Sequence, residues 1–316
     1  WLYDKKVTTF DEMANISKKN KQWLSENYEI GREAPSAARK SSDGTVKYLF
    51  KVGNGNSIES VYIPDKDRAT LCVSSQAGCK MNCYFCATGK MGFKANLTAA
   101  QIINQILSIP PAPQKGFEPM NPLTNIVFMG MGEPLDNFKE VKRVIEILTA
   151  PWGLAWSPKR ITVSTVGKLP QLKELLEETQ VHVAISVHTA DTPQRESMMP
   201  AQKAFPISSV MKVLGAYDFS HQRRLSLEYI MWRNVNDDIA HAEMLVKLIG
   251  QLDCRVNLIR FHAIPGVQLQ PSSEDKMLMF RSYLNSKGIT ATIRASRGED
   301  IEAACGMLSN QLGIRN

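Results

Sequence analysis

Long apolar runs are absent from this sequence of 316 residues. A transmembrane helix needs about 18 or more consecutive apolar residues, so we expect no membrane span and no membrane partner. Internal repeats, low-complexity segments and a glycine-rich dinucleotide fingerprint are also missing. The hydrophobic fraction of 43% and the charged fraction of 22% are those of an ordinary globular chain, which excludes wholesale disorder, a coiled coil and a collagen-like fibre.

Cysteine is scarce, with six residues in the whole chain. A small secreted protein stabilised by disulfides needs a higher density of cysteine, so that class is excluded. Clustered thiols in a larger chain favour a metal or redox centre in a reducing compartment, and we expect a cytoplasmic protein. Four of the six are clustered and two stand alone: Cys72, Cys79, Cys83 and Cys86, then Cys254 and Cys305.

Neither sign of charge dominates the composition. Lys and Arg number 38 against 31 Asp and Glu, which gives a formal net charge of +7. A mildly basic chain is compatible with a nucleic-acid partner. The excess is spread along the sequence without a polybasic tail, so charge alone does not identify the partner.

From about residue 68 onward, short apolar strands alternate with amphipathic helices. This rhythm predicts a parallel sheet buried on both faces, either a barrel, an open part of one, or a doubly wound sheet. In each case the chemistry is expected in the loops after the strands. The strands predicted are Thr70–Ser74, Thr124–Met129, Arg160–Thr165, Val181–Val187, Leu225–Met231, Arg255–Arg260 and Ile289–Arg294. The helices predicted are Thr98–Leu107, Phe138–Leu148, Leu169–Glu177, Ser208–Tyr217, Ile239–Gly250 and Glu274–Ser286.

Residues 1–64 have a different pattern and predict a small separate module, with residues 65–316 forming the second domain. Because the first residue is Trp1 rather than methionine, we expect this module to be truncated. The stretch Arg32–Gly44 is rich in Ala, Ser and Lys and predicts a mobile connection. The other elements expected are helical turns around Phe10 and Trp23 and a β-hairpin of Val46–Val52 and Ser57–Ile63.

The most informative residues follow the first strand after residue 68. Cys79, Cys83 and Cys86 form a C-x3-C-x2-C loop. Three thiolates can bind three irons of a [4Fe-4S] cluster and leave the fourth iron open to a ligand. A structural zinc site with Cys72 as the fourth ligand is the alternative from spacing alone.

Four segments of the chain resemble the RlmN/Cfr family of radical S-adenosylmethionine (SAM) RNA adenine methyltransferases, with the RlmN branch nearer. They read TLCVSSQAGCKMNCYFCATGKMGF, FMGMGEPLDN, SVHT and RGEDIEAACG, and the resemblance extends over roughly residues 1–310. It implies an α/β fold, namely a partial (βα)6-type radical SAM barrel with a small N-terminal α+β accessory module.

The resemblance also implies the cofactors and the residues that bind them. A [4Fe-4S] cluster with an open iron would be bound by Cys79, Cys83 and Cys86, and two SAM molecules would be used per turnover. Where family members often carry asparagine after the sixth strand, this chain has His262. The residues expected around SAM are Gly132, Glu133, Ser164, Ser186, Val187, His188 and His262.

Three further residues match catalytic positions of the family. Cys305 would carry the methyl group as S-methylcysteine, and Cys72 would form a transient disulfide with it. Glu59 would act as the general base. Without the resemblance, Cys305 and Cys254 are more simply interpreted as packed thiols, and Glu59 as an exposed strand carboxylate.

The reaction implied is methylation of carbon 2 of an adenine in 23S rRNA, and also in tRNA. Methylation at carbon 8 of the same rRNA adenine, the Cfr activity, is the alternative within the family. A non-catalytic iron–sulfur or zinc RNA-binding protein is the alternative of another class. The expected partners are the RNA and a flavodoxin-like one-electron donor, and the chain is expected to be a monomer.

Overall fold

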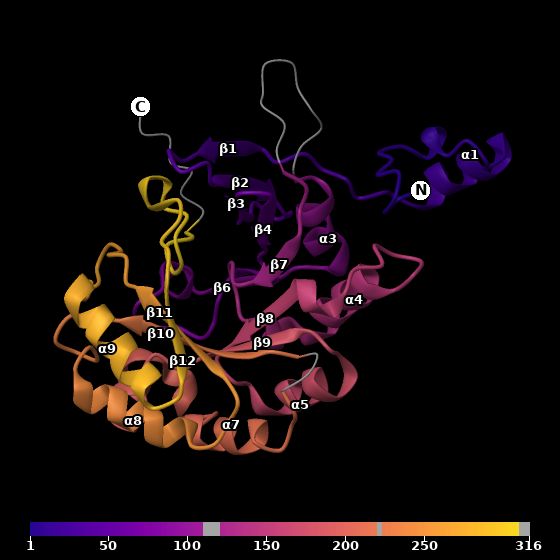
Figure 1. Cartoon of the computed structure of the whole chain (residues 1–316). Helices are drawn as coiled ribbons and strands as arrows, with labels where there is room; N and C mark the ends of the chain where they lie inside the picture. Colours follow the sequence, from indigo (N-terminus) through magenta and orange to yellow (C-terminus); the bar gives the residue numbers. More distant parts are fainter. Residues whose placement is uncertain (110–120, 220–222, 310–316) are drawn as a thin grey trace.

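The structure is a computed structural model that describes residues 1–109, 121–219 and 223–309. A ten-stranded mixed sheet is its centre (Figure 1), with the spatial order β1-β2-β3-β4-β7-β8-β9-β10-β11-β12. A separate two-stranded sheet pairs β5 with β6. The strands are β1 (Ala37–Lys40), β2 (Val46–Lys51), β3 (Ser57–Asp65), β4 (Arg68–Cys72), β5 (Gln76–Gly78), β6 (Phe93–Asn96), β7 (Asn125–Phe128), β8 (Ile161–Thr165), β9 (His182–Ser186), β10 (Leu225–Met231), β11 (Arg255–Arg260) and β12 (Thr290–Arg294).

The helices follow the parallel strands and cover the outside of the sheet (Figure 1). Neighbouring helices contact each other in the order α3–α4, α5–α7, α7–α8 and α8–α9. The helices are α1 (Lys18–Asn27), α2 (Ala87–Lys90), α3 (Ala99–Leu107), α4 (Phe138–Thr149), α5 (Leu169–Glu178), α6 (Thr192–Met198), α7 (Ile207–Leu214), α8 (Ile239–Ile249) and α9 (Glu274–Ser286).

The seven predicted parallel strands and the six predicted helices are confirmed, with small shifts at their ends. Strands β4 and β7 to β12 pair in parallel throughout. Their central residues, such as Ile126, Val163, Ile185, Leu227 and Leu258, are fully buried. Helices on the outside and side chains on the inside cover both faces, which is why these strands are apolar runs rather than alternating ones. Six strand–helix units and a final strand form the partial barrel.

The sheet continues across residue 64. Strand β3 pairs antiparallel with β4, and Val61 lies opposite Cys72. The predicted hairpin is confirmed as β2 and β3. The prediction of a mobile connection over Arg32–Gly44 is wrong in part, because Ala37–Lys40 pairs with β2 as the edge strand β1. The division into two domains stays a prediction.

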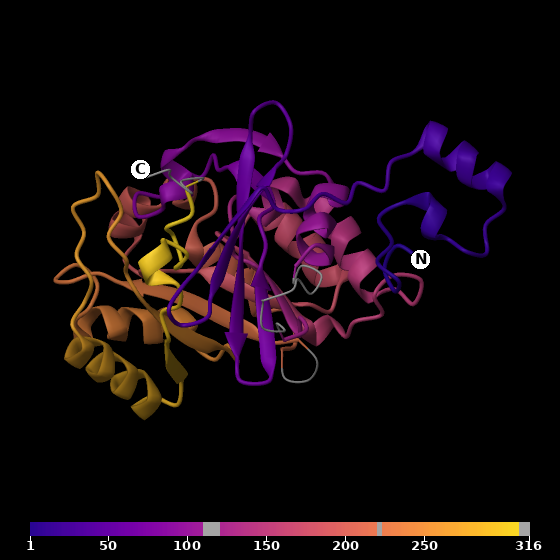
Figure 2. The same cartoon turned by 90° about the horizontal axis from the view of Figure 1, so that it is seen from above.

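The first helical residues stand apart from this sheet. Figures 1 and 2 show α1 on a separate arm beside the barrel. Three hydrogen bonds tie the chain after this arm to α3: Arg32 donates to the Leu107 carbonyl, the Glu33 amide donates to Asn104, and the Asn104 side-chain amide donates to the Glu33 carbonyl. Within the described residues no helix is long and apolar enough to cross a membrane.

Sequence periodicity did not reveal the β5–β6 hairpin or α6. Each β5–β6 strand has only three or four residues, which is too short for a clear pattern. The hairpin needs glycine at position 78, where φ is +70° and an added Cβ would lie 1.9 Å from the Gly92 carbonyl oxygen. The hairpin brackets the cysteine loop and so fixes where that loop starts and ends.

Candidate active site

A cavity of about 150 Å³ lies at the carboxyl ends of the parallel strands. The cysteine loop forms one wall, and the loops after β7, β8 and β9 form the others. The residues around it that carry polar atoms or sulfur include Cys79, Cys83, Cys86, Glu133, Ser164, Ser186, His188, Glu228, Arg294 and Cys305. The barrel therefore gathers at one place residues from six different parts of the sequence, as expected for this end of a parallel sheet.

The cysteine loop is fixed by backbone hydrogen bonds at both ends. The Cys79 amide donates to the Gly92 carbonyl over 3.2 Å, and the Tyr84 amide donates to the Met198 carbonyl at the end of α6 over 2.8 Å. Burial, followed by the charges of Glu133 and Cys86, raises the pKa of Cys79 to about 12. Burial, followed by the thiols of Cys86 and Cys79, raises the pKa of Cys83 well above its usual range. The pKa of Cys86 is raised as well, again chiefly by burial. Three buried thiols facing one cavity would need a bound cation to become thiolates together.

The donor set fits a cluster better than a single ion. Among the described residues, no three His, Cys, Asp or Glu side chains are close enough to bind one metal ion. Cys72, the proposed fourth zinc ligand, lies in a different cavity beside Cys305. A tetrahedral zinc site needs its ligands around one point, whereas a cluster binds each cysteine through a different iron. The arrangement of Cys79, Cys83 and Cys86 therefore fits the [4Fe-4S] hypothesis.

The loop after β7 brings its backbone close to neighbouring strands. At Gly130 an added Cβ would lie 2.7 Å from the Val73 carbonyl oxygen. Gly132 has φ of +99°, and its added Cβ would lie 2.5 Å from the Gln76 Cβ. The carboxylate of Glu133 accepts hydrogen bonds from the amides of Leu135 and Val166. Burial raises the pKa of Glu133, although these hydrogen bonds oppose the shift.

The predicted SAM-binding residues divide into two groups. Gly132, Glu133, Ser164, Ser186 and His188 line the cavity. Val187 and His262 do not: Val187 is fully buried, and the His262 ring faces the C-terminal segment. Its Nε2 lies 3.1 Å from the Ser296 hydroxyl, and its Nδ1 lies 3.3 Å from a Glu299 carboxylate oxygen. Contact of either residue with SAM stays a prediction.

His188 is buried and in a left-handed backbone conformation, with φ of +57°. Its Nδ1 accepts a hydrogen bond from the Ile230 amide, and its ring meets Phe85 edge-on. Burial, and then the nearby Arg195 guanidinium, lowers the pKa of His188 to about 3. This imidazole is therefore neutral and serves as a fixed part of the cavity wall.

Cys72 and Cys305 line a second, smaller cavity of about 80 Å³. Cys72 ends β4 and is half-buried, whereas Cys305 is exposed in a turn. Burial, with a smaller contribution from the Cys305 thiol, raises the pKa of Cys72 to about 12. The Cys305 thiol is also the largest cause of a raised pKa at Arg294. Arg294 therefore faces both thiols and can stabilise a thiolate at either.

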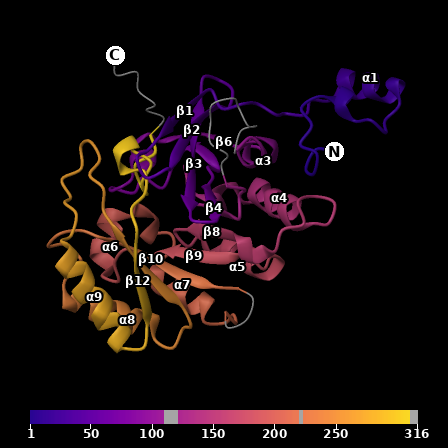
Figure 3. The same cartoon turned by 45° about the horizontal axis from the view of Figure 1, so that its top comes forward.

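The segment that carries Cys305, residues 298–309, is called the strap here. In Figures 1 and 3 it rises from the end of β12 to the strands β1 and β2. Two hydrogen bonds tie it to the cysteine loop: the Ala87 amide donates to the Gly306 carbonyl over 2.8 Å, and the Thr88 hydroxyl donates to the Leu308 carbonyl over 2.6 Å. These contacts hold Cys305 beside Cys86 at the edge of the first cavity.

The far side of the strap is bound by the turn between β1 and β2. The Asp300 carboxylate accepts from the Ser41 hydroxyl and the Ser42 amide. The Gly298 amide donates to Asp43 over 3.0 Å, and the Lys47 ammonium donates to the Glu302 carbonyl over 3.2 Å. The N-terminal strands therefore help to position Cys305.

Glu59 is completely buried in β3, not exposed as its sequence alone suggested. One carboxylate oxygen lies 3.1 Å from the Lys47 ammonium, and the other accepts a hydrogen bond from the Ser309 amide over 3.0 Å. The strap thus covers Glu59, and the structure places it outside both cavity linings. Its role as a base stays a prediction.

Sequence patterns did not identify Glu228 and Arg195. Glu228 reaches the first cavity from β10 and lies 3.8 Å from Arg294. Arg195 in α6 has no exposed surface and donates to the carbonyls of Val166, Ser186 and Val187. A charged residue among the apolar residues of a strand was the available signal for Glu228. No signal distinguished Arg195 from a surface cation.

Comparisons with known proteins agree with this site. Residues 73–245 match the Radical SAM superfamily. Over 314 residues the chain is 59% identical to a protein of Parabacteroides distasonis named "Probable dual-specificity RNA methyltransferase RlmN", covering 99% of this chain and 89% of that protein. A protein of Bacteroides thetaiotaomicron with the same name is 58% identical over 309 residues, covering 98% of this chain and 87% of that protein.

A solved structure shows the same fold over nearly the whole length. It is a radical SAM methyltransferase from Sphaerobacter thermophilus, 36% identical, with a TM-score of 0.90 over 98% of this chain and 90% of that one. The expected radical SAM α/β fold is thereby confirmed. A cavity walled by three thiols, a partial barrel and full-length similarity lead to one conclusion: the chain belongs to the RlmN family of radical SAM enzymes, which methylate RNA.

Proposed function

We propose that this enzyme methylates carbon 2 of an adenine in 23S rRNA and in tRNA, with Cys305 as the methyl carrier and Cys72 as its resolving thiol. One observation supports the proposal most directly: Cys72, Cys305 and Arg294 line one small cavity that adjoins the cysteine loop at Cys86. Both thiols are free, so both are available for this chemistry.

The residues present fit the cofactors of the superfamily. Cys79, Cys83 and Cys86 would bind a [4Fe-4S] cluster, and the loop of Gly132 and Glu133, with Ser164, Ser186 and His188, would bind SAM. When bound, these cofactors supply a one-electron reduction and an adenosyl radical able to remove a hydrogen atom. The chain itself contributes burial, which excludes water and competing acceptors from the radical.

Cys305 would act first as a nucleophile. Its thiolate, which lies beside Arg294, would attack the methyl carbon of one SAM. The bond from that carbon to the sulfonium breaks, Cys305 becomes S-methylcysteine and S-adenosylhomocysteine leaves. Loss of a hydrogen atom from this methyl group leaves a carbon-centred radical on the carrier. That radical adds to carbon 2, a position without a lone pair, and joins Cys305 to the base through a methylene bridge.

Cys72 and Glu59 would complete the turnover. Glu59 removes the proton from carbon 2. The unpaired electron of the adduct would pass to the [4Fe-4S] cluster that Cys79, Cys83 and Cys86 would hold, which leaves a closed-shell thioether between Cys305 and the base. The Cys72 thiolate attacks the Cys305 sulfur, and the bond from that sulfur to the methylene carbon breaks. The methylene carbon keeps the electron pair and takes up a proton to become the methyl group, and a Cys72–Cys305 disulfide forms as the methylated base leaves. For Glu59 to reach the base, the strap must first release it from the Ser309 amide. A flavodoxin-like donor would supply the single electron that the cluster needs, and an external dithiol reductant would supply the two electrons and two protons that restore the thiols of Cys72 and Cys305. We expect the enzyme to be cytoplasmic and monomeric.

Replacement of the resolving thiol tests this scheme. With Cys72→Ala, the carrier can still add to the base but cannot be released, so a covalent protein–RNA adduct should accumulate on a gel. Cys305→Ala should give neither adduct nor product. The control is Ser282→Ala, which removes a small polar group from an exposed position of α9 and should leave product formation unchanged.

Mass analysis of the digested RNA identifies the position of methylation. 2-Methyladenosine is the expected product of the unaltered enzyme. If 8-methyladenosine predominates, the carbon-2 assignment is wrong while the carrier scheme stands. If Cys305→Ala retains methylation, the carrier scheme itself is wrong.

A further inference from the structure

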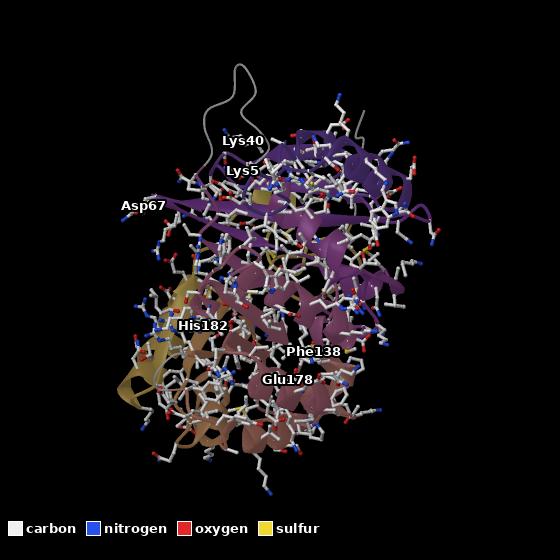
Figure 4. The ribbon with its side chains drawn as sticks, turned by 90° about the vertical axis from the view of Figure 1, so that its right-hand side faces the viewer. Lys5, Lys40, Asp67, Phe138, Glu178 and His182 are labelled. Atoms are coloured by element: carbon white, nitrogen blue, oxygen red, sulfur yellow. The ribbon has the colours of Figure 1, made fainter. Side chains whose placement is uncertain are left out.

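A cavity of about 510 Å³ lies at the end of the sheet where the parallel strands begin, opposite the cysteine loop. Four of its residues are the first residues of β7, β9, β10 and β11. Figure 4 looks onto this end of the barrel, with His182 labelled. Its lining consists of Asn125, Lys159, Thr162, His182, Phe219, Arg223, Arg224, Leu225, Asp253, Cys254 and Arg255.

The lining is strongly basic. It contains four permanent cations, Lys159, Arg223, Arg224 and Arg255, and a single carboxylate, Asp253. In the described part of the chain, the side chains of Lys159, Arg224 and Arg255 form no ion pair or hydrogen bond. Unpaired cations converging on one hollow create a local positive potential that attracts an anion.

His182 adds a neutral hydrogen-bond donor to this group. Its Nδ1 accepts from the Arg224 amide over 2.9 Å, so the proton of the neutral ring resides on Nε2. Burial, followed by the positive charges of Arg224, Lys159 and Arg223, lowers the pKa of His182. The cations therefore lie close enough to this ring to add to the effect of burial, and both favour its uncharged form.

Arg223 carries a second, independent indication of a ligand. Only 6% of this residue is exposed. One nitrogen, Nη1, donates to the Leu176 carbonyl over 2.8 Å. The other two, Nε and Nη2, are buried and have no partner among the described residues. Burying charged donors without acceptors costs free energy. An acceptor from outside the chain would accept the hydrogen bonds that Nε and Nη2 of Arg223 do not form within it.

Stabilisation of helix ends explains only part of this arrangement. The helices run opposite to the strands, so their carboxyl ends lie at this end of the barrel, where cations interact favourably with them. The bond from Arg223 to Leu176, near the end of α5, is such a contact. This contact leaves two nitrogens of Arg223 unpaired. It does not explain why Lys159, Arg224 and Arg255 line the same cavity.

We propose that this cavity binds the phosphate group of a nucleotide, with Arg223, Arg224 and Arg255 as its contacts. Guanidinium groups match the oxygens of a phosphate with paired hydrogen bonds. The volume is within the range of small-molecule sites, and Phe219 and Leu225 offer apolar surface to the rest of the ligand. The phosphate belongs either to a free nucleotide or to a nucleotide within the RNA substrate. The proposal does not depend on the position of methylation.

Calorimetric titration of the full, anaerobically prepared chain tests it. The probes are AMP, inorganic phosphate and a short single-stranded RNA with hydroxyl groups at both ends. We expect saturable binding that Arg224→Ala/Arg255→Ala weakens at least about tenfold. The matched control, Lys139→Ala/Lys173→Ala, removes two exposed cations on α4 and α5 outside the lining and should leave binding unchanged.

The probes distinguish the two sources of phosphate. Tight binding of AMP that the RNA does not displace assigns a free nucleotide, whereas displacement of AMP by the RNA, lost in the double variant, assigns an RNA nucleotide. Arg223→Gln, followed by thermal melting, tests whether Arg223 serves only to stabilise the end of α5. In that case the melting temperature falls while binding of AMP is unchanged, and Arg223 is not a phosphate contact. If no probe binds in the unaltered chain, or all bind equally well to Arg224→Ala/Arg255→Ala, the proposal is overturned. Methyl transfer is measured separately, so failure of the proposed function is distinguishable.

Discussion

Several residues in this enzyme are unusual because they are both buried and polar. Arg195 is surrounded by neutral acceptors, the carbonyls of Val166, Ser186 and Val187 and the amide oxygen of Gln202. No carboxylate in the described chain pairs with it. Arg195 joins the ends of β8 and β9 and so fixes the cavity wall. It also lies near Cys83, where its positive charge complements negative charge on the cysteine loop. Such groups make the wall rigid at the cost of sensitivity to substitution.

The buried imidazole of His188 predicts a dependence of stability on pH. Its pKa is lowered to about 3 in the folded chain, below the value of about 6.5 in the unfolded chain. The unfolded state therefore takes up a proton first as the pH falls. The resulting stability is present above about pH 6.5 and declines toward the folded pKa, with a loss of about 2 kcal/mol at pH 5.

Denaturant unfolding at pH 7, 6 and 5 measures this effect. His188→Gln should lower the free energy of unfolding at pH 7 and flatten its decline between pH 7 and 5. His241→Gln, on the outside of the barrel in α8, should keep the slope of the unaltered chain. A His188→Gln variant with the same slope as the parent would contradict the prediction.

At the scale of elements, the strap shows how distant segments build one site. It follows the last strand, yet its contacts are with the turn after β1, with β2 and β3, and with the cysteine loop. Glycine at position 298 allows its sharp start, because φ is +63° and an added Cβ would lie 2.9 Å from a Thr45 methyl carbon. Orientation of Cys305 therefore depends on residues 41–47 as well as on its own neighbours.

Loss of the charge on Asp300 should loosen the strap. Asp300→Asn keeps the size of the side chain but weakens its bonds to Ser41 and Ser42, so single-turnover methyl transfer should fall about fivefold. Iron content should not change, because the cysteine loop is intact. Glu302→Gln removes another carboxylate of the strap, one without a side-chain contact in the described structure, and serves as the control.

Limited proteolysis provides the second measurement. The strap of Asp300→Asn should be cut faster than that of the parent and of Glu302→Gln. Equal cleavage rates together with unchanged methyl transfer would show that the turn after β1 does not position Cys305.

For the whole molecule, the continuous sheet matters most. The second half of β3, from Val61 to Asp65, pairs with the whole of β4. Tyr48, Phe50 and Ile58 belong to the same buried core as the barrel strands. The ion pair of Lys47 and Glu59 is fully buried beneath the strap. These contacts join the expected N-terminal module to the barrel, whereas α1 stands on its separate arm (Figure 2).

A truncation series tests the expected boundary at residue 64. A chain starting at residue 65 would expose one edge of β4 and part of the core, so we expect it to aggregate or to unfold without cooperativity. A chain starting at residue 30 removes α1 but keeps the sheet, and should unfold in one calorimetric transition near that of the parent. Cooperative unfolding of the 65–316 fragment at the same temperature would support two independent domains.

The sequence by itself determined the barrel and the identity of the cysteine loop. Apolar strands between amphipathic helices are a local signal, because both faces of a parallel strand are buried wherever the strand lies in the sheet. The C-x3-C-x2-C spacing is equally local, since one loop supplies all three thiols. The short β5–β6 hairpin and the pairing of Ala37–Lys40 were missed because they lack such a local signal. Their structure depends on their partner strands rather than on their own pattern.

Only the tertiary structure decided which distant residues meet. The burial of Glu59 against Lys47 and the gathering of Arg223, Arg224 and Arg255 at the opposite end of the barrel depend on how separate elements pack. The approach of Cys72 to Cys305 depends on the same packing, and only the family resemblance predicted it. The surroundings of a side chain set its burial and its charge state. A carboxylate or guanidinium has the same sequence signature whether it faces water or a cavity. The sequence therefore determined the elements and the chemistry of one loop, while packing decided the neighbours that give each thiol and charge its role.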